Sequence, residues 1–341
     1  MVQHRIALVG LGMAVTPHAK SLIDLADRAE VVRVMSPSAA RREAFSARFP
    51  FPASDSLAAV LEDASIDAVA VLTPPSTHLE IVTALARAGK HVLLEKPVDV
   101  STARAEQLVA ACRDAGVVLG VVLQHRFKPA AERLAGILRA GELGTVVNCS
   151  TSIRLWRPQS YYDEPGRGTR ARDGGGVLLT QGIHTLDLML SLAGPVAEVS
   201  GYARTSPVHR METEDLVCAA MRFAGGAVGV IDATTAAYPG APERIELIGT
   251  HGTASLAGTA LAVHFNDGRR VAVEADASPG GTGADPMAFP HDYHLGVWRD
   301  FLDAIDARRP PRVSGEEALK VHRLIDALLE AGSSGRRVDV R

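Results

Sequence analysis

The sequence predicts two domains: an α/β domain built on a parallel sheet, then an α+β domain with a large, open and mostly antiparallel sheet. At 341 residues the chain is longer than one hydrophobic core usually grows. Residues 1–123 alternate short β-branched runs with Ala- and Leu-rich helical stretches, the rhythm of βαβ units. Beyond residue 140, strand-like runs follow one another with few helices between them. We therefore expect domains at 1–123 and 124–341.

In the first domain, strands and helices alternate. We expect strands at 5–9, 31–35, 68–72, 91–94 and 117–122, because these runs are apolar and rich in β-branched residues. Apolar positions recurring every three or four residues predict helices at 17–28, 39–48, 56–63, 77–88 and 101–115. Gly89 and Gly116 follow two of these helices, where a left-handed C-cap favours a residue without Cβ. Five strands are enough for a doubly wound sheet.

The second domain has a different rhythm. A helix at 128–140 leads into strands at 145–153, 196–203, 215–223, 227–234 and 244–249, and the apolar run 178–192 reads as a helix. A Gly- and Pro-rich segment at 277–290 predicts a mobile loop. Helices at 294–307 and 315–331 are expected to close the chain.

Composition excludes several classes of function. Hydrophobic residues make up 47% and charged residues 22%, as in ordinary globular proteins. With 36 Lys and Arg against 39 Asp and Glu, the chain has no cationic excess for nucleic acid or an anionic membrane. We find neither a signal-peptide core nor the roughly 18 apolar residues of a membrane span, so the cytoplasm is the expected location. Three distant cysteines suggest neither a disulfide framework nor a metal site, and no bound metal is expected.

A glycine turn follows the first expected strand. Gly10-Leu11-Gly12 leads directly into a helix, the setting in which backbone approaches a pyrophosphate at a helix N-terminus. The third glycine of the usual fingerprint is replaced by Val15. A tight turn without ligand is the alternative, but the βα units behind it favour a dinucleotide.

The end of the second strand bears on which dinucleotide binds. An Asp or Glu commonly meets the ribose 2′-hydroxyl there, yet this chain has Met35-Ser36-Pro37, with Arg41 and Arg42 following. A missing carboxylate and a nearby guanidinium suit a 2′-phosphate, which favours NADP over NAD. Two solvated surface arginines are the open alternative.

Four motifs together carry a family resemblance. They are Gly10-x-Gly12 with His18 and Leu22, the run Thr73-Pro74-Pro75-Ser76-Thr77-His78, the run 88–97 ending in Glu95-Lys96-Pro97, and the run 174–187 containing Gly174-Gly175-Gly176 and His184. In this order they span most of the chain and resemble the Gfo/Idh/MocA oxidoreductases. That family includes glucose-fructose oxidoreductase, inositol dehydrogenase and many sugar and sugar-nucleotide dehydrogenases.

The resemblance implies a Rossmann dinucleotide-binding domain, then a domain whose open sheet face forms homodimer or homotetramer contacts, with the active site in the cleft between them. It implies that Lys96 contacts substrate and nicotinamide, that Pro97 follows a cis bond, and that His184 takes the hydroxyl proton. Relatives such as inositol dehydrogenase carry an aspartate four residues before this histidine, where this chain has Thr180. The expected NAD(P)-binding residues are Gly10, Gly12, Met13, Ala14, Ser36, Arg41, Thr73, Pro74, His78, Glu95, Lys96, Pro97 and Arg126.

The residue chemistry supports the two catalytic candidates. A histidine titrates close enough to neutral pH to remove a hydroxyl proton, which suits His184. Lys96 ends a parallel strand, where open α/β sheets bind ligands and where a cation could stabilise an alkoxide. If 178–192 is a helix, Thr180, His184 and Asp187 share one face and Gln181 lies nearby, so Asp187 could support the imidazole. A buried core histidine and an exposed strand-end lysine are the alternatives.

A cluster of tyrosines and arginines precedes the glycine triplet. It would suit an anionic group on the substrate, and the expected substrate-binding residues are Lys96, Arg157, Tyr161, Tyr162, Arg172, Gln181 and His184. A solvated loop whose arginines pair with Asp163, Glu164 and Asp173 is the alternative. The segment 156–163 resembles relatives acting on sugar nucleotides or uronic acids, and less closely aromatic diol-acid dehydrogenases.

We therefore expect an NAD(P)-dependent dehydrogenase acting on a secondary alcohol of a small, sugar-like molecule. Two alternatives remain at this stage. One is an enzyme that keeps its cofactor bound through the turnover cycle. The other is a dinucleotide-binding sensor or regulatory subunit without catalysis.

Overall fold

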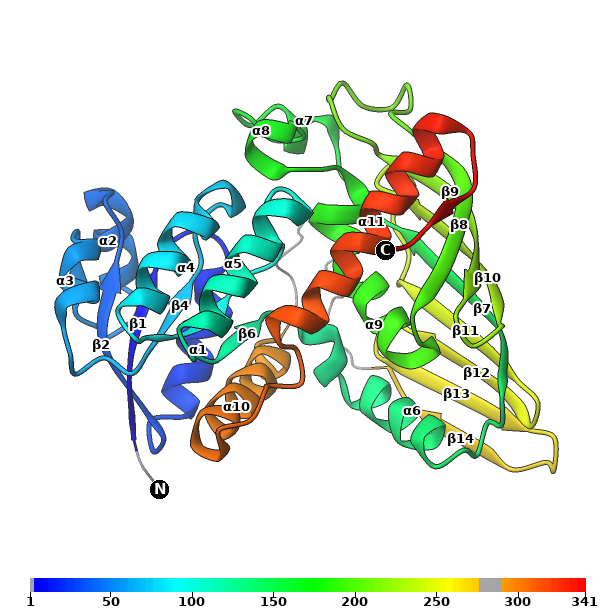
Figure 1. The fold of residues 1–341 in the computed structure, drawn as a ribbon, viewed down its shortest axis with the longest axis horizontal. Coiled ribbons are helices and arrows are strands. Elements are labelled where there is room, and N and C mark those ends of the chain that lie inside the picture. Colours follow the sequence, from blue (N-terminus) through cyan, green and yellow to red (C-terminus); the bar gives the residue numbers. More distant parts are fainter. Residues whose placement is uncertain (1–2, 276–289) are drawn as a thin grey trace. The chain divides into compact units, whose positions relative to one another are not determined.

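The computed structural model describes residues 3–275 and 290–341 (Figure 1). The chain divides into two compact units, Met1–Leu123 with Pro290–Leu319, and Gln124–Phe289 with Lys320–Arg341. The loop predicted at 277–290 lies outside the described residues, apart from Pro290.

One segment belongs to a different unit from the one we expected. Helix α10 (Asp292–Ala307) and the start of α11 (Gly315–Ser334) are grouped with the first unit, whereas the sequence assigned 124–341 to the second domain. The physical reason is burial. Trp298 and Phe301 of α10 are completely buried, and Phe301 packs so closely on the sheet that a Cβ at Gly120 would lie 3.0 Å from its ring. Sequence order therefore gives a poor guide to domain membership here.

In the first unit, six described strands form a parallel sheet in the order β3-β2-β1-β4-β5-β6, the order of the Rossmann fold. The strands are β1 (His4–Val9), β2 (Ala29–Met35), β3 (Ala53–Ser54), β4 (Ala68–Val71), β5 (His91–Leu94) and β6 (Leu119–Val121). Strand β4 is buried at all four residues, which explains its continuous apolar run. The chain order reverses between β1 and β4, and ligands of open α/β sheets bind beyond the strand ends at such a point.

Helices cover this sheet: α1 (Val15–Asp24), α2 (Ala39–Ser46), α3 (Leu57–Glu62), α4 (His78–Arg87), α5 (Thr102–Asp114) and the short η1 (Pro75–Thr77). Three of them begin at a serine N-cap. The hydroxyl of each of Ser38, Ser56 and Ser101 accepts a hydrogen bond from the backbone N–H of the residue three positions later in the sequence. The two-residue strand β3 was not predicted, because two residues are too few to show the alternation of apolar and polar residues that is typical of a strand.

In the second unit, nine described strands form a sheet in the order β14-β13-β12-β11-β7-β10-β9-β8-β15. All neighbours are antiparallel except β7 and β10, which are parallel. The strands are β7 (Val146–Arg154), β8 (Val196–Arg204), β9 (Leu216–Phe223), β10 (Val228–Thr234), β11 (Arg244–Gly249), β12 (Gly252–Ala257), β13 (Ala260–Phe265), β14 (Arg270–Val273) and β15 (Val338–Asp339). The last four were not predicted.

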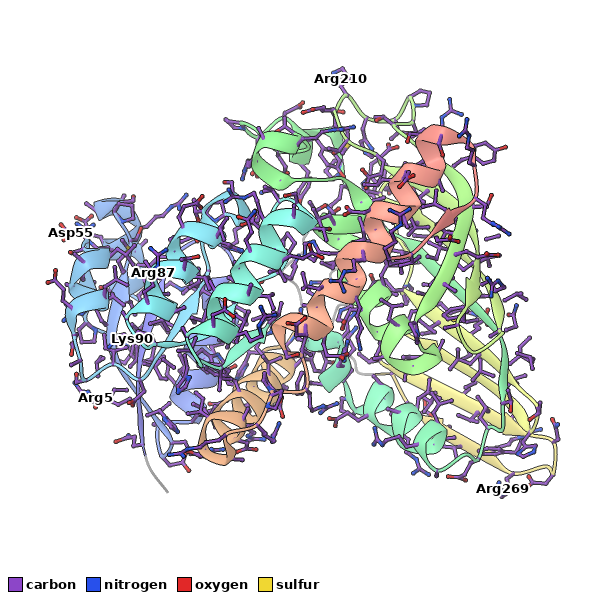
Figure 2. The ribbon with its side chains drawn as sticks, viewed as in Figure 1. Arg5, Asp55, Arg87, Lys90, Arg210 and Arg269 are labelled. Carbon is purple, nitrogen blue, oxygen red and sulfur yellow. The ribbon has the colours of Figure 1, made fainter. Side chains whose placement is uncertain are left out.

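Helices lie against one face of this sheet (Figure 1). They are α6 (Pro129–Arg139), α9 (Ile183–Ala193) and α11, whose Gly332 approaches β8 so closely that a Cβ there would lie 2.5 Å from Ala203. Tyr202, Val228 and Val230 project from the opposite face and are 76%, 55% and 49% exposed. Arg210, between β8 and β9, and Arg269, between β13 and β14, lie at far ends of this unit (Figure 2).

The remaining helical segments run from residue 124 to 193: η2 (Gln124–Phe127), α7 (Gln159–Tyr162), α8 (Arg170–Asp173) and the π-helix η3 (Leu178–Gly182) leading into α9. The stretch Arg170–Ala193 is long and apolar enough to cross a membrane by length and composition alone, but 78% of its apolar window is buried inside the protein.

Candidate functional site

The turn between β1 and α1 is locked by its first glycine. Gly10 has a φ of 105°, and a Cβ on it would lie 2.7 Å from the carbonyl carbon and oxygen of Leu72. Its N–H donates to the Met35 carbonyl at 2.9 Å. The turn is therefore fixed between the carboxyl ends of β2 and β4, and only glycine fits there.

The space beyond this turn is open. A Cβ on Gly12 would meet no atom within 4 Å. Helix α1 starts at Val15, and its N-cap Ala14 offers no side-chain hydrogen bond to the first-turn N–H groups. Unsatisfied N–H groups at a helix start bind pyrophosphate. This turn, with Met13 exposed beside it, fits a dinucleotide. Val15 points into the core, so no third glycine is needed for the helix to start here.

At the end of β2 the two arginines have different environments. Arg42 donates from Nη1 to the Ser36 carbonyl at 2.6 Å, and its Nη2 lies 4.0 Å from Asp55. Arg41 is exposed at the start of α2, where its backbone N–H donates to the Ser38 hydroxyl. Arg42 thus holds the turn, while the guanidinium of Arg41 faces solvent.

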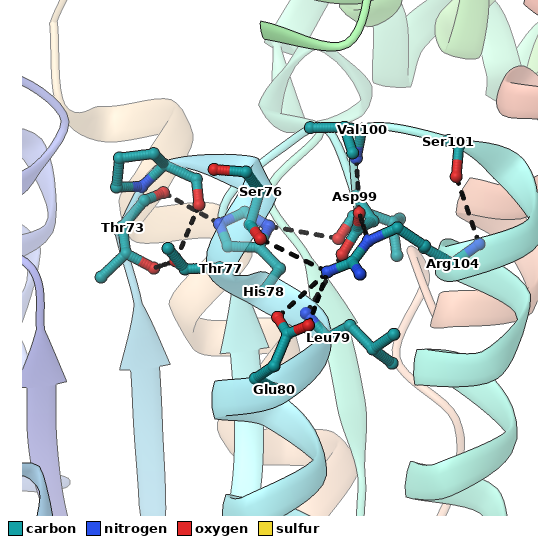
Figure 3. A network of polar contacts seen from close by, with 12 residues as sticks. Thr73, Ser76, Thr77, His78, Leu79, Glu80, Asp99, Val100, Ser101 and Arg104 are labelled. Atoms are coloured by element: carbon teal, nitrogen blue, oxygen red, sulfur yellow. Dashed lines mark hydrogen bonds and ion pairs between the residues drawn. The ribbon is translucent and has the colours of Figure 1, made fainter. Parts of the chain in front are cut away.

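The turns after β4 and β5 are joined by His78, which is completely buried (Figure 3). Its Nε2 lies 2.9 Å from the Thr73 carbonyl, and its Nδ1 lies 3.1 Å from the carbonyls of Pro97 and Val98. Burial lowers the pKa of His78. We expected this residue to bind cofactor, but both ring nitrogens face backbone carbonyls, so its side chain positions the two turns instead.

Asp99 extends this network (Figure 3). Its carboxylate accepts the N–H groups of Leu79 and Val100 and the Nε–H of Arg104 at 2.6 Å. Arg104 in turn reaches Glu80. The residues that follow Lys96 are therefore pinned to α4 and α5.

Glu95, which precedes Lys96, is anchored from the other side. Its Oε1 lies 3.0 Å from Nε2 of His18, and its Oε2 accepts the backbone N–H of Lys96 at 3.0 Å. Trp298 of α10 donates its indole N–H to Nδ1 of His18 at 3.0 Å. Because an indole can only donate, His18 must carry its proton on Nε2. Burial acts to raise the pKa of Glu95, but its bond with His18 and nearby positive charge lower it overall.

Glu95 was expected at the cofactor, yet its carboxylate is committed to His18 and to the turn. The peptide bond between Lys96 and Pro97 is cis, as the resemblance implied. Lys96 thus stands at the carboxyl end of β5 on a turn that the core holds from both sides.

Three possible metal ligands meet beside this turn. Ligand atoms of His18, Glu95 and His294 lie within 4.8 Å of one another. Residues so far apart in sequence give no spacing signal, so the sequence could not reveal this group. With Nδ1 of His18 accepting from Trp298 and Nε2 donating to Glu95, neither nitrogen of His18 presents a lone pair to an ion. Burial lowers the pKa of His294 to about 3, which keeps it neutral.

In the second unit, Glu214 holds the start of the helix that carries His184. Its carboxylate accepts the N–H groups of Gly176 at 3.1 Å and Leu178 at 3.2 Å, and burial raises its pKa. A Cβ on Gly176 would lie 1.8 Å from the Glu214 carbonyl oxygen. The third glycine of the triplet, Gly176, is therefore needed for this close approach.

The helix differs from the prediction in one respect. Residues 178–182 form a π-helix, whose wider turns change the angular position of Thr180 relative to His184. Thr180 lies in this π-helix and His184 in α9, so the regular α-helix predicted over 178–192 is interrupted between them. The Thr180 hydroxyl donates to the Gly176 carbonyl at 2.7 Å and also contacts the Gln181 side chain.

Asp187 forms an ion pair with Arg126. Both of its oxygens accept from Arg126 of η2, at 2.6 Å and 2.7 Å, and Asp187 is 1% exposed. Arg126 was a cofactor candidate and Asp187 a support for His184. Their bidentate pair fastens η2 to α9.

This fastening brings His125 against His184. The two ring centroids lie 5.0 Å apart with a tilt of 33°, and Nδ1 of His125 lies 3.7 Å from Oε2 of Glu243. The sequence analysis missed both His125 and Glu243. A histidine next to Arg126 was a weak signal, and Glu243 lies too far along the chain for any spacing to connect it with His184.

Only some of the tyrosines and arginines that were expected to form one cluster lie close to one another. The Tyr161 hydroxyl accepts from Arg167 at 2.8 Å and from Gln181 at 3.4 Å, and the Arg167 guanidinium lies 4.2 Å from the Tyr161 ring centroid. Arg157 is 3% exposed and lies 5.8 Å from the same centroid. These residues surround the π-helix. The alternative of arginines paired within the loop holds in part, because Arg167 also binds Glu164.

Two expected substrate residues have structural roles. The Tyr162 hydroxyl bonds to Thr235 at 2.8 Å inside the core, and burial raises its pKa. Arg172 donates to the Pro165 carbonyl at 2.6 Å. The Tyr162 ring packs edge-on against Tyr161, with the ring centroids 5.0 Å apart.

Known proteins match both units. Residues 4–123 match the model of an oxidoreductase family with an NAD-binding Rossmann fold, and residues 131–255 match the GFO/IDH/MocA C-terminal domain. The scyllo-inositol 2-dehydrogenase (NAD⁺) of Bacillus subtilis is 30% identical over 74% of this chain and 73% of its own. The D-apiose dehydrogenase of Paraburkholderia graminis is 28% identical over 98% of this chain and 89% of its own.

Among solved structures, the WlbA dehydrogenase of Bordetella pertussis, in complex with NADH and UDP-GlcNAcA, is similar along its whole length. It has a TM-score of 0.84 and 28% identity, covering 99% of each chain. The strand order, the glycine turn and the matches to both halves agree. This chain belongs to the Gfo/Idh/MocA family of NAD(P)-dependent oxidoreductases.

Proposed function

We propose that this oxidoreductase moves hydride between a nicotinamide and a secondary alcohol of a sugar, sugar acid, sugar nucleotide or cyclic polyol. The observation that carries the proposal is the setting of His184. It lies on a helix fixed by Glu214 and by the Asp187–Arg126 pair, beside a second imidazole. A histidine held in this way suits proton transfer.

Each residue has a defined task in this proposal. The imidazole of His184 accepts the hydroxyl proton of the substrate. The Lys96 ammonium stabilises the negative charge that develops on that oxygen. The nicotinamide, when bound, takes up or gives the hydride. The Gly10–Gly12 turn and the start of α1 hold the pyrophosphate.

Arg41 supports a preference for NADP. Its guanidinium is exposed beyond β2, and no carboxylate follows Met35 directly. A 2′-phosphate would gain a charge-assisted bond with Arg41 and meet no repulsion from the strand end. The Tyr161, Arg167 and Gln181 group favours a substrate that carries a carboxylate or phosphate.

The test is a reduction assay with NAD⁺ and NADP⁺ against polyols, uronic acids and nucleotide sugars. In His184→Asn and in Lys96→Ala we expect kcat/KM to fall about 10²- to 10⁴-fold, the usual size of a general-base contribution. In His184→Asn, cofactor binding measured by fluorescence should stay within a few-fold of wild type. Wild-type turnover in both variants would instead favour a non-catalytic sensor.

We also propose that the exposed face of the second sheet joins copies of this chain into a homodimer or homotetramer. The support is the run of exposed apolar side chains on β8 and β10.

A further inference from the structure

We propose that Glu243, acting through His125, is the positioning carboxylate of this enzyme and supplies the counter-charge for the proton that His184 accepts. This inference rests on the proposed role of His184. Thr180, four residues before His184 in the sequence, carries no charge that could play this part.

The geometry forms a short chain of three groups. Glu243 precedes β11, His125 lies on η2 and His184 on α9, so three separate elements bring them together. The carboxylate is 3.7 Å from the nearer His125 nitrogen, and the His125 ring lies against the His184 ring. The side chains of His125 and Glu243 are only 14% and 15% exposed. At such low exposure, charges interact more strongly than in water.

Among Glu243, His125 and His184, the carboxylate is the acidic group, and other charged residues lie near all three. On η2 and α9, the charges of Arg126 and Asp187 neutralise each other in a bidentate pair. After β7, Arg157 lies near enough to feel the charge of Glu243. A cation near a carboxyl group favours the ionised form of that group, so Arg157 acts in the direction that the proposal requires.

Two imidazoles whose ring centroids lie 5.0 Å apart interact electrostatically with each other and with a nearby carboxylate. The negative charge of the carboxylate stabilises a single positive charge on the two imidazole rings, because the two opposite charges attract each other. A proton taken from the substrate by His184 is therefore better tolerated with Glu243 than without it. In the reverse reaction the same proton returns to the substrate oxygen, so no further reactant is needed.

The experiment compares the pH dependence of kcat/KM in the full-length holoenzyme. In Glu243→Gln we expect about a tenfold lower kcat and an acid-limb pKa lower by about half a unit to one unit. Glu243→Asp, which keeps the charge, should restore most of both. Glu246→Gln is the matched control, because Glu246 is a half-exposed glutamate on β11 paired with Arg244. It should leave the profile unchanged.

A double-variant cycle tests the route through His125. If Glu243 acts through that ring, Glu243→Gln should have no further effect on the profile in a His125→Asn background. An undiminished effect in that background would overturn the relay. An unchanged profile in Glu243→Gln alone would overturn the role of Glu243.

The proposed function can fail separately. If His184→Asn keeps wild-type turnover, His184 is not the proton acceptor and the proposed function is wrong. If His184→Asn loses turnover while Glu243→Gln keeps the wild-type profile, only the present inference falls. Thermal unfolding of every variant separates lost folding from lost chemistry.

Discussion

Gly10 and Gly12 lie two residues apart, yet different surroundings select them. The space beside Gly10 is filled by the backbone of Leu72 and Thr73, and its φ is positive. A Cβ on Gly12 would meet no atom of the described residues within 4 Å, its chain neighbours aside. The first glycine is therefore a requirement of the fold, and for the second we propose a requirement of the ligand.

This contrast gives a paired prediction. Gly10→Ala should lose about 2–4 kcal/mol of unfolding free energy, because both the strained φ and the backbone overlap oppose it. Gly12→Ala should unfold within about 0.5 kcal/mol of wild type but lose at least tenfold in NAD(P) affinity, since its methyl group would occupy the pyrophosphate position. Denaturant titration and fluorescence binding measure the two effects. Wild-type affinity in Gly12→Ala would contradict the assignment of this turn.

Buried histidines predict a loss of stability in acid. Burial lowers the pKa of His322 to about 4. The folded state therefore binds fewer protons than the unfolded state between about pH 6.5 and 4. The contribution of His322 to the free energy of unfolding is fully present above pH 6.5. It declines by about 3 kcal/mol in all as the pH falls toward 4.

Urea titrations from pH 7.5 to 4.5 check this. His322→Gln should reduce the slope of unfolding free energy against pH by up to about 1.4 kcal/mol per pH unit. His264→Gln, an exposed residue of β13, should leave the slope as it is. Equal slopes in all three proteins would show that His322 protonates equally well in the folded state.

The sequence could reveal a site residue only where that residue stands in a short motif of neighbouring residues. Gly10, Gly12, Lys96 and His184 stand in short motifs with a chemical reason for their spacing. His125 and Glu243 lie 59 residues before and after His184 and become neighbours only through η2 and β11. His78 and Glu95 stood in the right motifs, but only the coordinates showed that their side chains face the protein.

Among the elements, α10 shows how a distant helix supports the turn that carries Lys96. Its Trp298 donates to His18, which bonds to Glu95, whose carboxylate accepts the N–H of Lys96. The spacing of apolar residues predicted this helix, but such spacing does not indicate which sheet a helix packs against. Strands β12 to β15 were not predicted: β12 consists largely of small residues, and β14 and β15 have only four and two residues.

Trp298→Phe tests this support. The ring remains, but His18 loses a donor in a buried place, so we expect a cost of about 1–3 kcal/mol and a several-fold lower kcat. Phe301→Leu, nearly one turn further along α10, is the matched control. It removes ring volume without a hydrogen bond and should lower stability while sparing kcat. Equal losses of kcat in the two variants would argue against a role for the indole N–H.

For the whole molecule, the open sheet face should determine assembly. Val230 is 49% exposed in the middle of β10, and Val208 is 47% exposed in the loop after β8. Val230→Glu should shift the mass measured by light scattering toward the monomer, because a buried charge opposes association. Val208→Glu carries the same change off the sheet and should keep the wild-type mass. A monomeric wild type would refute the proposed assembly.

The membership of Pro290–Leu319 in the first unit has a consequence for synthesis. The ribosome delivers residues 1–123 early, but the Trp298 and Phe301 side chains that complete their packing are translated only after strands β7 to β14. Until then the nascent nucleotide-binding half exposes an apolar surface where α10 belongs, and chaperones are suited to shield such a surface. The packing of this half is complete only once α10 has been translated.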